Sequence, residues 1–93
     1  MSQANILIVD DSPTYVEAIR HILERHSHTC TVANTGKEGI ELAIKNKPDL
    51  ILMDVIMPIM SGFQATRQLS KNPETASIPV VIISTKDQET DRL

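Results

Sequence analysis

The sequence predicts an α/β fold in which a parallel sheet lies between two layers of helices. Short apolar segments alternate along the chain with longer segments whose apolar residues recur at helical spacing. Three of the four short segments are continuous apolar runs, as is typical of strands buried on both faces of a parallel sheet. Alternation of this kind implies right-handed crossovers and a three-layer arrangement.

Four strands are expected, and their order along the chain is NILIV (5–9), TCTVA (29–33), LILM (50–53) and VVII (80–83). The second segment alternates polar and apolar residues, unlike the other three. Because alternation indicates a strand with one solvated face, TCTVA is expected at an edge of the sheet.

Three helices are expected between these strands, at residues 13–26, 36–46 and 63–71. Pro13 suits the first helical position, and Ser12 can cap that helix through its side-chain oxygen. Pro48 ends the second helix, Gly62 permits the turn into the third, and Pro79 precedes the last strand. The expected apolar stripes are, in order, Val16, Ile19, Ile22 and Leu23; Ile40, Ala43 and Ile44; and a weaker one with Phe63, Leu69 and either Thr66 or Arg67.

Length and composition narrow the function classes. The 93 residues are enough for one domain, whose core must be aliphatic because the chain has one Phe, one Tyr and no Trp. The net charge of −3, without a basic stripe, argues against direct nucleic-acid binding. The single Cys30 has no internal partner for a disulfide and is expected in a strand as a small hydrophobe. Neither a leader nor a membrane-spanning run is evident, so a soluble, cytoplasmic chain without membrane contact is expected.

Three aspartates come directly after predicted strands. Asp10 and Asp11 follow the first strand and Asp54 follows the third, at the sheet edge where open α/β folds bind ligands. If the first and third strands are neighbours, these carboxylates converge. At an effective dielectric constant of about 20, two such charges about 4 Å apart repel by roughly 4 kcal/mol. A hard cation would offset that repulsion, and Mg²⁺ is the natural choice for oxygen-only ligands.

Hydroxyl groups are expected at the same edge, because Ser84 and Thr85 follow the fourth strand. Carboxylates, hydroxyls and a divalent cation together predict a site for a phosphoryl group, with a carboxylate attacking in line to give an aspartyl phosphate. Asp54 is the best nucleophile because it stands alone on a central strand, whereas the adjacent pair is better arranged to hold a metal. Simpler roles are also open: Asp11 as a helix cap, Asp54 as a turn former and Ser84 as a cap.

The motifs LIVDDSP, LILMDVIMPIMSGFQATRQL and IPVVIIST make the chain resemble the response-regulator receiver domains of two-component signalling, the CheY-like family. The resemblance spans all 93 residues. It implies a flavodoxin-like sheet with strand order 2-1-3-4. Beyond self-phosphorylation from small phosphodonors and autodephosphorylation, it implies no enzymatic activity. The stretch that begins with GFQATRQL is similar to the PilH-like single-domain receivers of type IV pilus (twitching) systems, which places the chain in motility or chemotaxis.

The resemblance also implies partners and residue roles. Asp54 would accept a phosphoryl group from a sensor histidine kinase or its phosphotransfer domain, and a downstream protein target would read the resulting conformational change. Asp11 would bind Mg²⁺ directly and Asp10 largely through water, while the backbone carbonyl of Ile56 would supply a further ligand. The other expected site residues follow the fourth strand: Ser84 as the switch hydroxyl, Thr85 beside the phosphate and Lys86 at a position that tunes dephosphorylation.

One departure from the family is expected at the C-terminal side. Receivers continue through a fifth strand, which carries a phosphate-contacting lysine, and a final helix, together about 30 residues. Residues 1–93 would then be an incomplete receiver whose fourth strand leaves an uncovered apolar edge. Three explanations stay open: a truncated receiver, an assembly in which two chains cover each other's edge, or a naturally shorter module. The open edge motivates the hypothesis of a homodimer or higher oligomer.

Other functions on the same fold are less consistent with the sequence. Flavodoxins need a phosphate-binding loop after the first strand, where DDSPT would repel the FMN phosphate. Aspartate-nucleophile phosphatases place a second Asp two residues beyond the nucleophile, where this chain has Ile56. The alternative that remains is a pseudo-receiver, which keeps the fold for protein contacts and is not phosphorylated.

Overall fold

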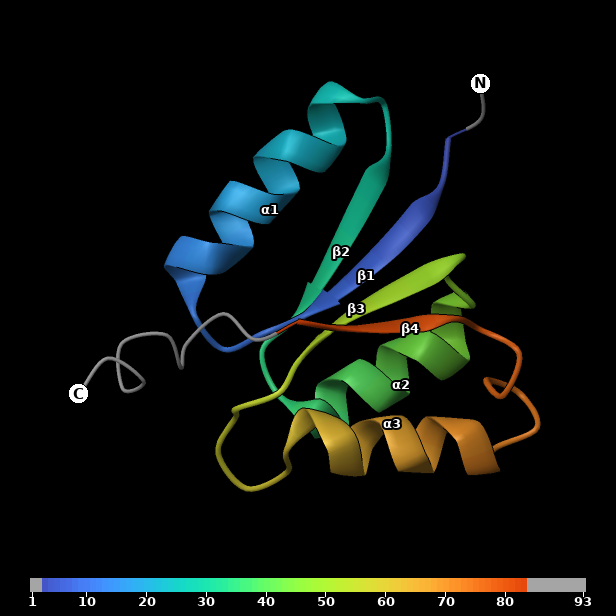
Figure 1. Cartoon of the computed structure of the whole chain (residues 1–93). Coiled ribbons are helices and arrows are strands. Elements are labelled where there is room, and N and C mark those ends of the chain that lie inside the picture. The colour runs from blue at the N-terminus through green and yellow to red at the C-terminus, as the bar shows by residue number, and fades with distance from the viewer. Residues whose placement is uncertain (1–2, 84–93) are drawn as a thin grey trace.

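A computed structural model describes residues 3–83, which form a four-stranded parallel sheet with helices on both faces (Figure 1). Their order along the chain is β1 (Asn5–Val9), α1 (Pro13–Arg25), β2 (Thr29–Ala33), α2 (Gly36–Asn46), β3 (Leu50–Asp54), α3 (Gly62–Lys71) and β4 (Val80–Ile83). The predicted elements are confirmed to within one residue at each end. Asp54 is the last residue of β3 and does not follow the strand.

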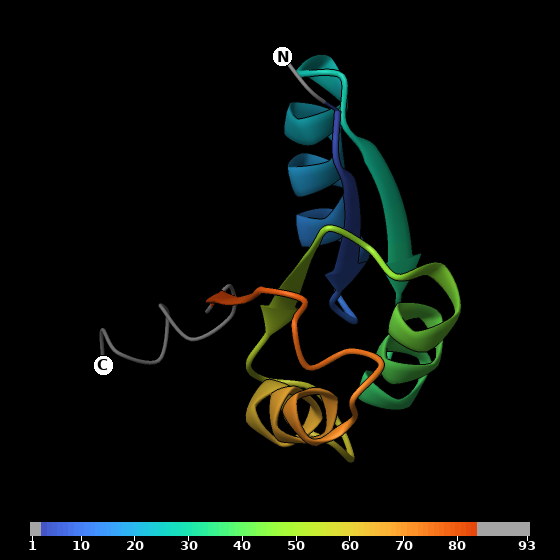
Figure 2. The same ribbon diagram turned by 90° about the vertical axis from the view of Figure 1, so that its right-hand side faces the viewer.

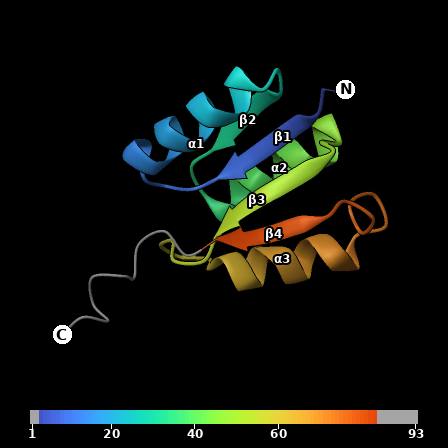
Figure 3. The same ribbon diagram turned by 45° about the horizontal axis from the view of Figure 1, so that its top comes forward.

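The strand order within the described sheet is β2-β1-β3-β4, as the family resemblance implied. Figure 3 shows the four strands side by side with their arrowheads at the same edge. Val9 pairs with Ala33 on one side and with Met53 on the other, so the C-terminal ends of the three strands are level. The edge position predicted for TCTVA is confirmed, because β2 has β1 as its only partner in the described sheet.

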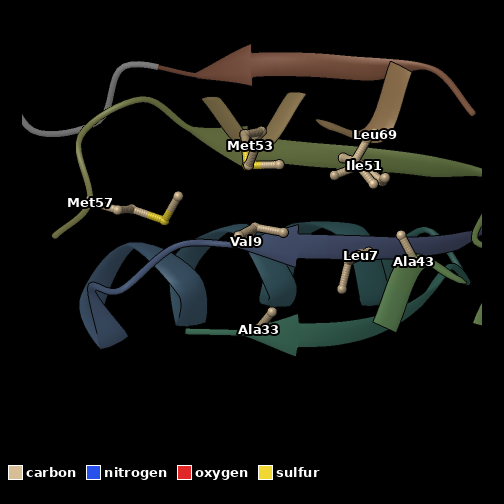
Figure 4. Close-up of a cluster of buried hydrophobic side chains, with 9 residues drawn as sticks. Leu7, Val9, Ala33, Ala43, Ile51, Met53, Met57 and Leu69 are labelled. Atoms are coloured by element: carbon tan, nitrogen blue, oxygen red, sulfur yellow. The ribbon is translucent and has the colours of Figure 1, made fainter. Parts of the chain in front are cut away.

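Helix α1 packs on one face of the sheet, and α2 and α3 pack side by side on the other (Figure 2). The core between the sheet and α2 and α3 contains most of the fully buried side chains, several of which are seen in Figure 4. The smaller cluster under α1 has Ile6, Ile8 and Val16 at its centre. None of the helices among residues 3–83 has the length and apolar character that crossing a membrane requires.

Two of the apolar residues predicted for the core are exposed instead. Ile22 has 56% of its surface exposed, because consecutive helical residues are about 100° apart and α1 turns Leu23 toward the sheet. Phe63 is 61% exposed for the same reason, since α3 buries the face that carries Gly62, Ala65 and Leu69. The small residues on that face were not counted in the predicted stripe.

The helix starts use different caps. Ser61 and Gln64 form a capping box at α3, in which each side chain accepts a hydrogen bond from the other residue's backbone N–H. At α1 the predicted side-chain cap is wrong. Ser12 occupies the N-cap position, but its hydroxyl makes no capping hydrogen bond. Its backbone N–H donates to Oδ1 of Asp10 at 2.9 Å, so the neighbouring carboxylate orders the start of this helix.

Candidate functional site

The three predicted acidic residues lie together at the end of the sheet where the C-terminal ends of its strands meet. One carboxylate oxygen from each of Asp10, Asp11 and Asp54 lies within 4.8 Å of the other two. Asp10 and Asp54 are buried, whereas Asp11 is exposed. The cluster therefore has a buried floor and one side that opens to solvent.

Strand pairing explains why residues 44 positions apart in the sequence meet. Val9 and Met53 are register partners in β1 and β3, so Asp10 and Asp54, the next residue in each chain segment, are brought alongside. The backbone N–H of Asp10 also donates to the carbonyl of Ala33 at 3.0 Å, which ties the acidic turn to the end of β2. The prediction that the first and third strands are neighbours is confirmed, and the convergence of the carboxylates follows from it.

The backbone around Asp54 is held from both sides. Val55 donates its N–H to the carbonyl of Ile83 at 3.1 Å, which joins this segment to the end of β4. Gly62, the first residue of α3, donates to the carbonyl of Val55 at 2.9 Å. A Cβ atom at Gly62 would overlap the carbonyl oxygen of Asp54, so glycine alone permits α3 to start this close to the site.

The donor set suits a hard divalent cation. Three carboxylates at this separation repel one another, and two of them are shielded from the water that would otherwise screen their charge. Oxygen ligands with one open side are what Mg²⁺ uses, because this ion keeps several of its water ligands. A cation bound here would therefore neutralise the carboxylates and still leave room for an incoming anionic group.

Not every predicted site residue lies in the described part of the chain. Ser84, Thr85 and Lys86 are outside it; the last described residue, Ile83, is the register partner of Asp54. Ile56 lies two residues beyond Asp54, and its side chain is 48% exposed. The roles predicted for these four residues stay predictions.

A cavity of about 200 Å³ lies beside Asp10 and Asp11, and some residues that line it were not among the predicted site residues. Glu17, Arg20 and Asn34 line it together with Asp10 and Asp11. Arg20 donates to Glu17 at 3.0 Å, so its charge is partly compensated within α1. Spacing could have placed Glu17 and Arg20 on one face of α1. Asn34 directly follows the predicted second strand, which places it at this end of the sheet, but only the pairing of β1 with β2 brings it next to them.

Comparisons with known proteins agree with this geometry. A family model for the response regulator receiver domain matches residues 6–93. Protein PilH of Pseudomonas aeruginosa is 54% identical to this chain over 90 residues, which are 97% of this chain and 74% of that protein.

Solved structures show the same fold. The N-terminal domain of a response regulator receiver protein from Methanoculleus marisnigri JR1 is 32% identical, with a TM-score of 0.85 over 95% of this chain and 75% of that chain. The receiver domain of a sensor histidine kinase from Pseudomonas aeruginosa PAO1 is 25% identical, with a TM-score of 0.85 over 98% of this chain and 75% of that chain. That crystal structure holds a magnesium ion in its active-site cleft, and the three-aspartate cluster is consistent with such a site.

Proposed function

Because this chain belongs to the response regulator receiver domain family, we propose that Asp54 accepts a phosphoryl group from a histidine kinase or its phosphotransfer domain. The observation that carries the proposal is the convergence of three carboxylates within 4.8 Å, with Asp54 buried at the end of a central strand. The chain acts as a phosphoacceptor, and its own chemistry is limited to self-phosphorylation from small donors and autodephosphorylation.

Transfer to Asp54 is an in-line displacement at phosphorus. A carboxylate oxygen of Asp54 attacks phosphorus in line with the P–N bond of the phosphohistidine. The O–P bond forms as the N–P bond breaks, and the electron pair of that bond stays on the imidazole nitrogen, which then takes a proton from solvent. Because β3, β4 and α3 hold the backbone at Asp54, the attacking group is positioned before the donor arrives.

We propose the metal ligands by analogy with the family. Asp11 and Asp54 would hold Mg²⁺ directly, Asp10 would act largely through water, and the carbonyl of Ile56 would complete the protein ligands. When bound, the ion neutralises charge that develops on the phosphoryl oxygens. Three residues outside the described part of the chain complete the proposal: Ser84 as the switch hydroxyl, Thr85 beside the phosphate and Lys86 as a residue that tunes dephosphorylation.

The cellular role is proposed from the similarity to PilH. Residues 1–93 would act as one receiver domain in the cytoplasm, in type IV pilus motility or chemotaxis. Phosphorylation of Asp54 would change the surface that a downstream protein target recognises.

Intact-mass measurement tests phosphorylation directly. We expect the chain to gain the mass of one phosphoryl group when acetyl phosphate is added with Mg²⁺, and to gain none when EDTA is present. Asp54→Asn should abolish the gain, because the amide cannot act as the nucleophile. The matched control is Asp49→Asn. Asp49 is an exposed aspartate that directly precedes β3, at the opposite end of that strand from Asp54.

Two results would contradict the proposal. A mass gain that survives in Asp54→Asn would place the acceptor elsewhere. If the wild-type chain gains no mass although its circular dichroism shows a folded protein, the pseudo-receiver alternative would replace this function.

A further inference from the structure

Helix α3 turns an aromatic and basic face toward solvent. Phe63, Arg67 and Lys71 recur at four-residue spacing along this helix, and all three are exposed. Because residues four apart lie above one another on a helix, the three side chains form one stripe. The residues that α3 buries lie on its other side, against the core. We call Phe63, Arg67 and Lys71 the α3 stripe.

The two cations of the α3 stripe are not neutralised by neighbouring acids. Arg67 and Lys71 make no ion pair with any residue in the described range 3–83. By contrast, Arg20 and Lys47 are each paired with a glutamate. Helices α1 and α2 carry two glutamates each, whereas α3 has no acidic residue. In a chain with a net charge of −3, the outer face of α3 is therefore a local basic surface.

Folding does not account for the whole α3 stripe. Lys71 lies in the last turn of α3, where a cation interacts favourably with the helix dipole. That explanation does not extend to Arg67 in the middle of the helix. Arg67 has the right spacing to cover the ring of Phe63 by a cation–π contact, but 61% of Phe63 stays exposed. Single exposed apolar side chains are common, so the indication of a binding surface is the combination of an open ring with two unpaired cations.

The chemistry of the α3 stripe defines the partner that would fit it. Phe63 offers a large apolar contact, and aromatic and arginine side chains are the ones that most often anchor protein interfaces. The cations call for carboxylates on the partner. Residues four apart are about 6 Å apart along a helix axis, so a second helix with acidic residues at the same spacing can lie along α3 and meet Arg67 and Lys71 in turn.

Nucleic acids and membranes fit the same surface less well. Two cations displace few counterions from a nucleic acid, and the remainder of this negatively charged chain would repel the phosphates. A helix that binds at a membrane surface needs a broad apolar face toward the lipid, whereas α3 packs its apolar face against the sheet (Figure 2). An acidic protein segment is the partner class that matches both the charge and the single aromatic anchor.

We propose that the α3 stripe is a docking surface for an acidic amphipathic helix of a partner protein. Phe63 is the apolar anchor, and Arg67 and Lys71 pair with carboxylates of the partner. The inference does not depend on phosphorylation of Asp54. It adds to the phosphoacceptor function a surface through which another protein is held.

Peptide selection tests the proposal on the whole chain. A phage-displayed library of random peptides of about 16 residues, long enough for four turns of helix, is panned against the immobilised wild-type chain. Binding of the enriched peptides is then measured in solution by fluorescence anisotropy. Phe63→Ser removes the anchor, Phe63→Leu keeps an apolar side chain, and Arg67→Gln removes one cation. Ile22→Ser is the matched control, because Ile22 is similarly exposed but lies on α1. Thermal melting checks that each variant is folded.

We expect the enriched peptides to carry acidic residues at three- or four-residue spacing beside an apolar residue. Phe63→Ser should weaken their binding by about tenfold or more, the effect of losing an anchor residue from an interface. Arg67→Gln should weaken it by about threefold at low salt and by less as salt rises, because exposed charge pairs are screened. Phe63→Leu should weaken binding less than Phe63→Ser, and Ile22→Ser should bind like the wild type.

Several outcomes would overturn the docking proposal. Failure to enrich any peptide, or enrichment of peptides without acidic residues, would contradict the proposed partner class. Unchanged binding to Phe63→Ser would place the peptide elsewhere on the chain. Binding to vesicles of phosphatidylcholine and phosphatidylserine that Phe63→Ser abolishes would assign the α3 stripe to a membrane surface. Self-association in light scattering that Phe63→Ser abolishes would assign it to a second copy of this chain.

Discussion

The reactivity of the Cys30 thiol, on β2, depends on the groups that immediately surround it. Burial raises the pKa of the Cys30 thiol, the carboxylate of Glu24 raises it further, and the guanidinium of Arg20 opposes these effects. A raised pKa leaves less thiolate at neutral pH. The thiol is therefore expected to be less reactive in the folded chain than in the unfolded chain.

Alkylation of Cys30 measures this difference. Between about pH 7 and pH 9, iodoacetamide should modify the native protein more slowly than the urea-unfolded protein, because only the thiolate reacts. Glu24→Gln should speed the native reaction, since it removes one group that disfavours the thiolate. Glu41→Gln, which changes an exposed acid on α2, is the control and should have no effect. Equal rates in native and unfolded protein would show that the environment of Cys30 does not suppress its reactivity.

At the scale of secondary-structure elements, the distance between α2 and β1 depends on one glycine. A Cβ atom at Gly39 would lie 2.8 and 3.0 Å from the two methyl carbons of Val9; the first distance is shorter than real Cβ contacts and the second is very tight. Val9 is fully buried, where close packing leaves little space for its methyl groups to shift. The absence of a side chain at Gly39 therefore lets the helix approach the strand that ends at the acidic site.

Gly39→Ala should lower the free energy of unfolding by about 1–3 kcal/mol, the usual cost of overpacking a core. The result is diagnostic because alanine would otherwise favour the helix by about 1 kcal/mol. Urea denaturation measures the net change in the free energy of unfolding. Val9→Ala makes room for the new methyl group, so the double variant should lose less stability than the two single variants together. A Gly39→Ala protein as stable as the wild type would show that α2 can shift without cost.

At the scale of the whole molecule, the described sheet has β4 as one of its edges. β4 pairs with β3 alone among the described strands, and 46% of the surface of Val81 is exposed. An apolar edge strand is a template for pairing with another chain. Association of the 93-residue chain through this edge is the expected consequence.

Light scattering over a concentration series tests this association. The wild-type chain should show a mass that rises above that of the monomer, and Val81→Lys should stay monomeric because a charge on an edge strand opposes pairing. Ile22→Lys is the matched control, since Ile22 is similarly exposed but lies on α1. A wild-type chain that is monomeric at every concentration would contradict pairing through β4.

The sequence by itself determined the elements and the chemistry available to them. Strand and helix boundaries followed from apolar periodicity and from Pro and Gly positions, because these signals act over a few neighbouring residues. The placement of Asp10, Asp11 and Asp54 at strand ends was also readable, since a strand's end is a local property. Motifs around these residues then indicated the family.

Tertiary structure decided everything that depends on which elements are neighbours. The three carboxylates meet because β1 lies beside β3, and Asn34 lines a cavity with Asp10 and Asp11 because β2 lies on the other side of β1. The exposure of Ile22 and Phe63 depends on how each helix is rotated against the sheet, which a count of apolar residues does not fix. The positive φ angle of Ile59 likewise required the structure, because the sequence carries no glycine there that would signal it.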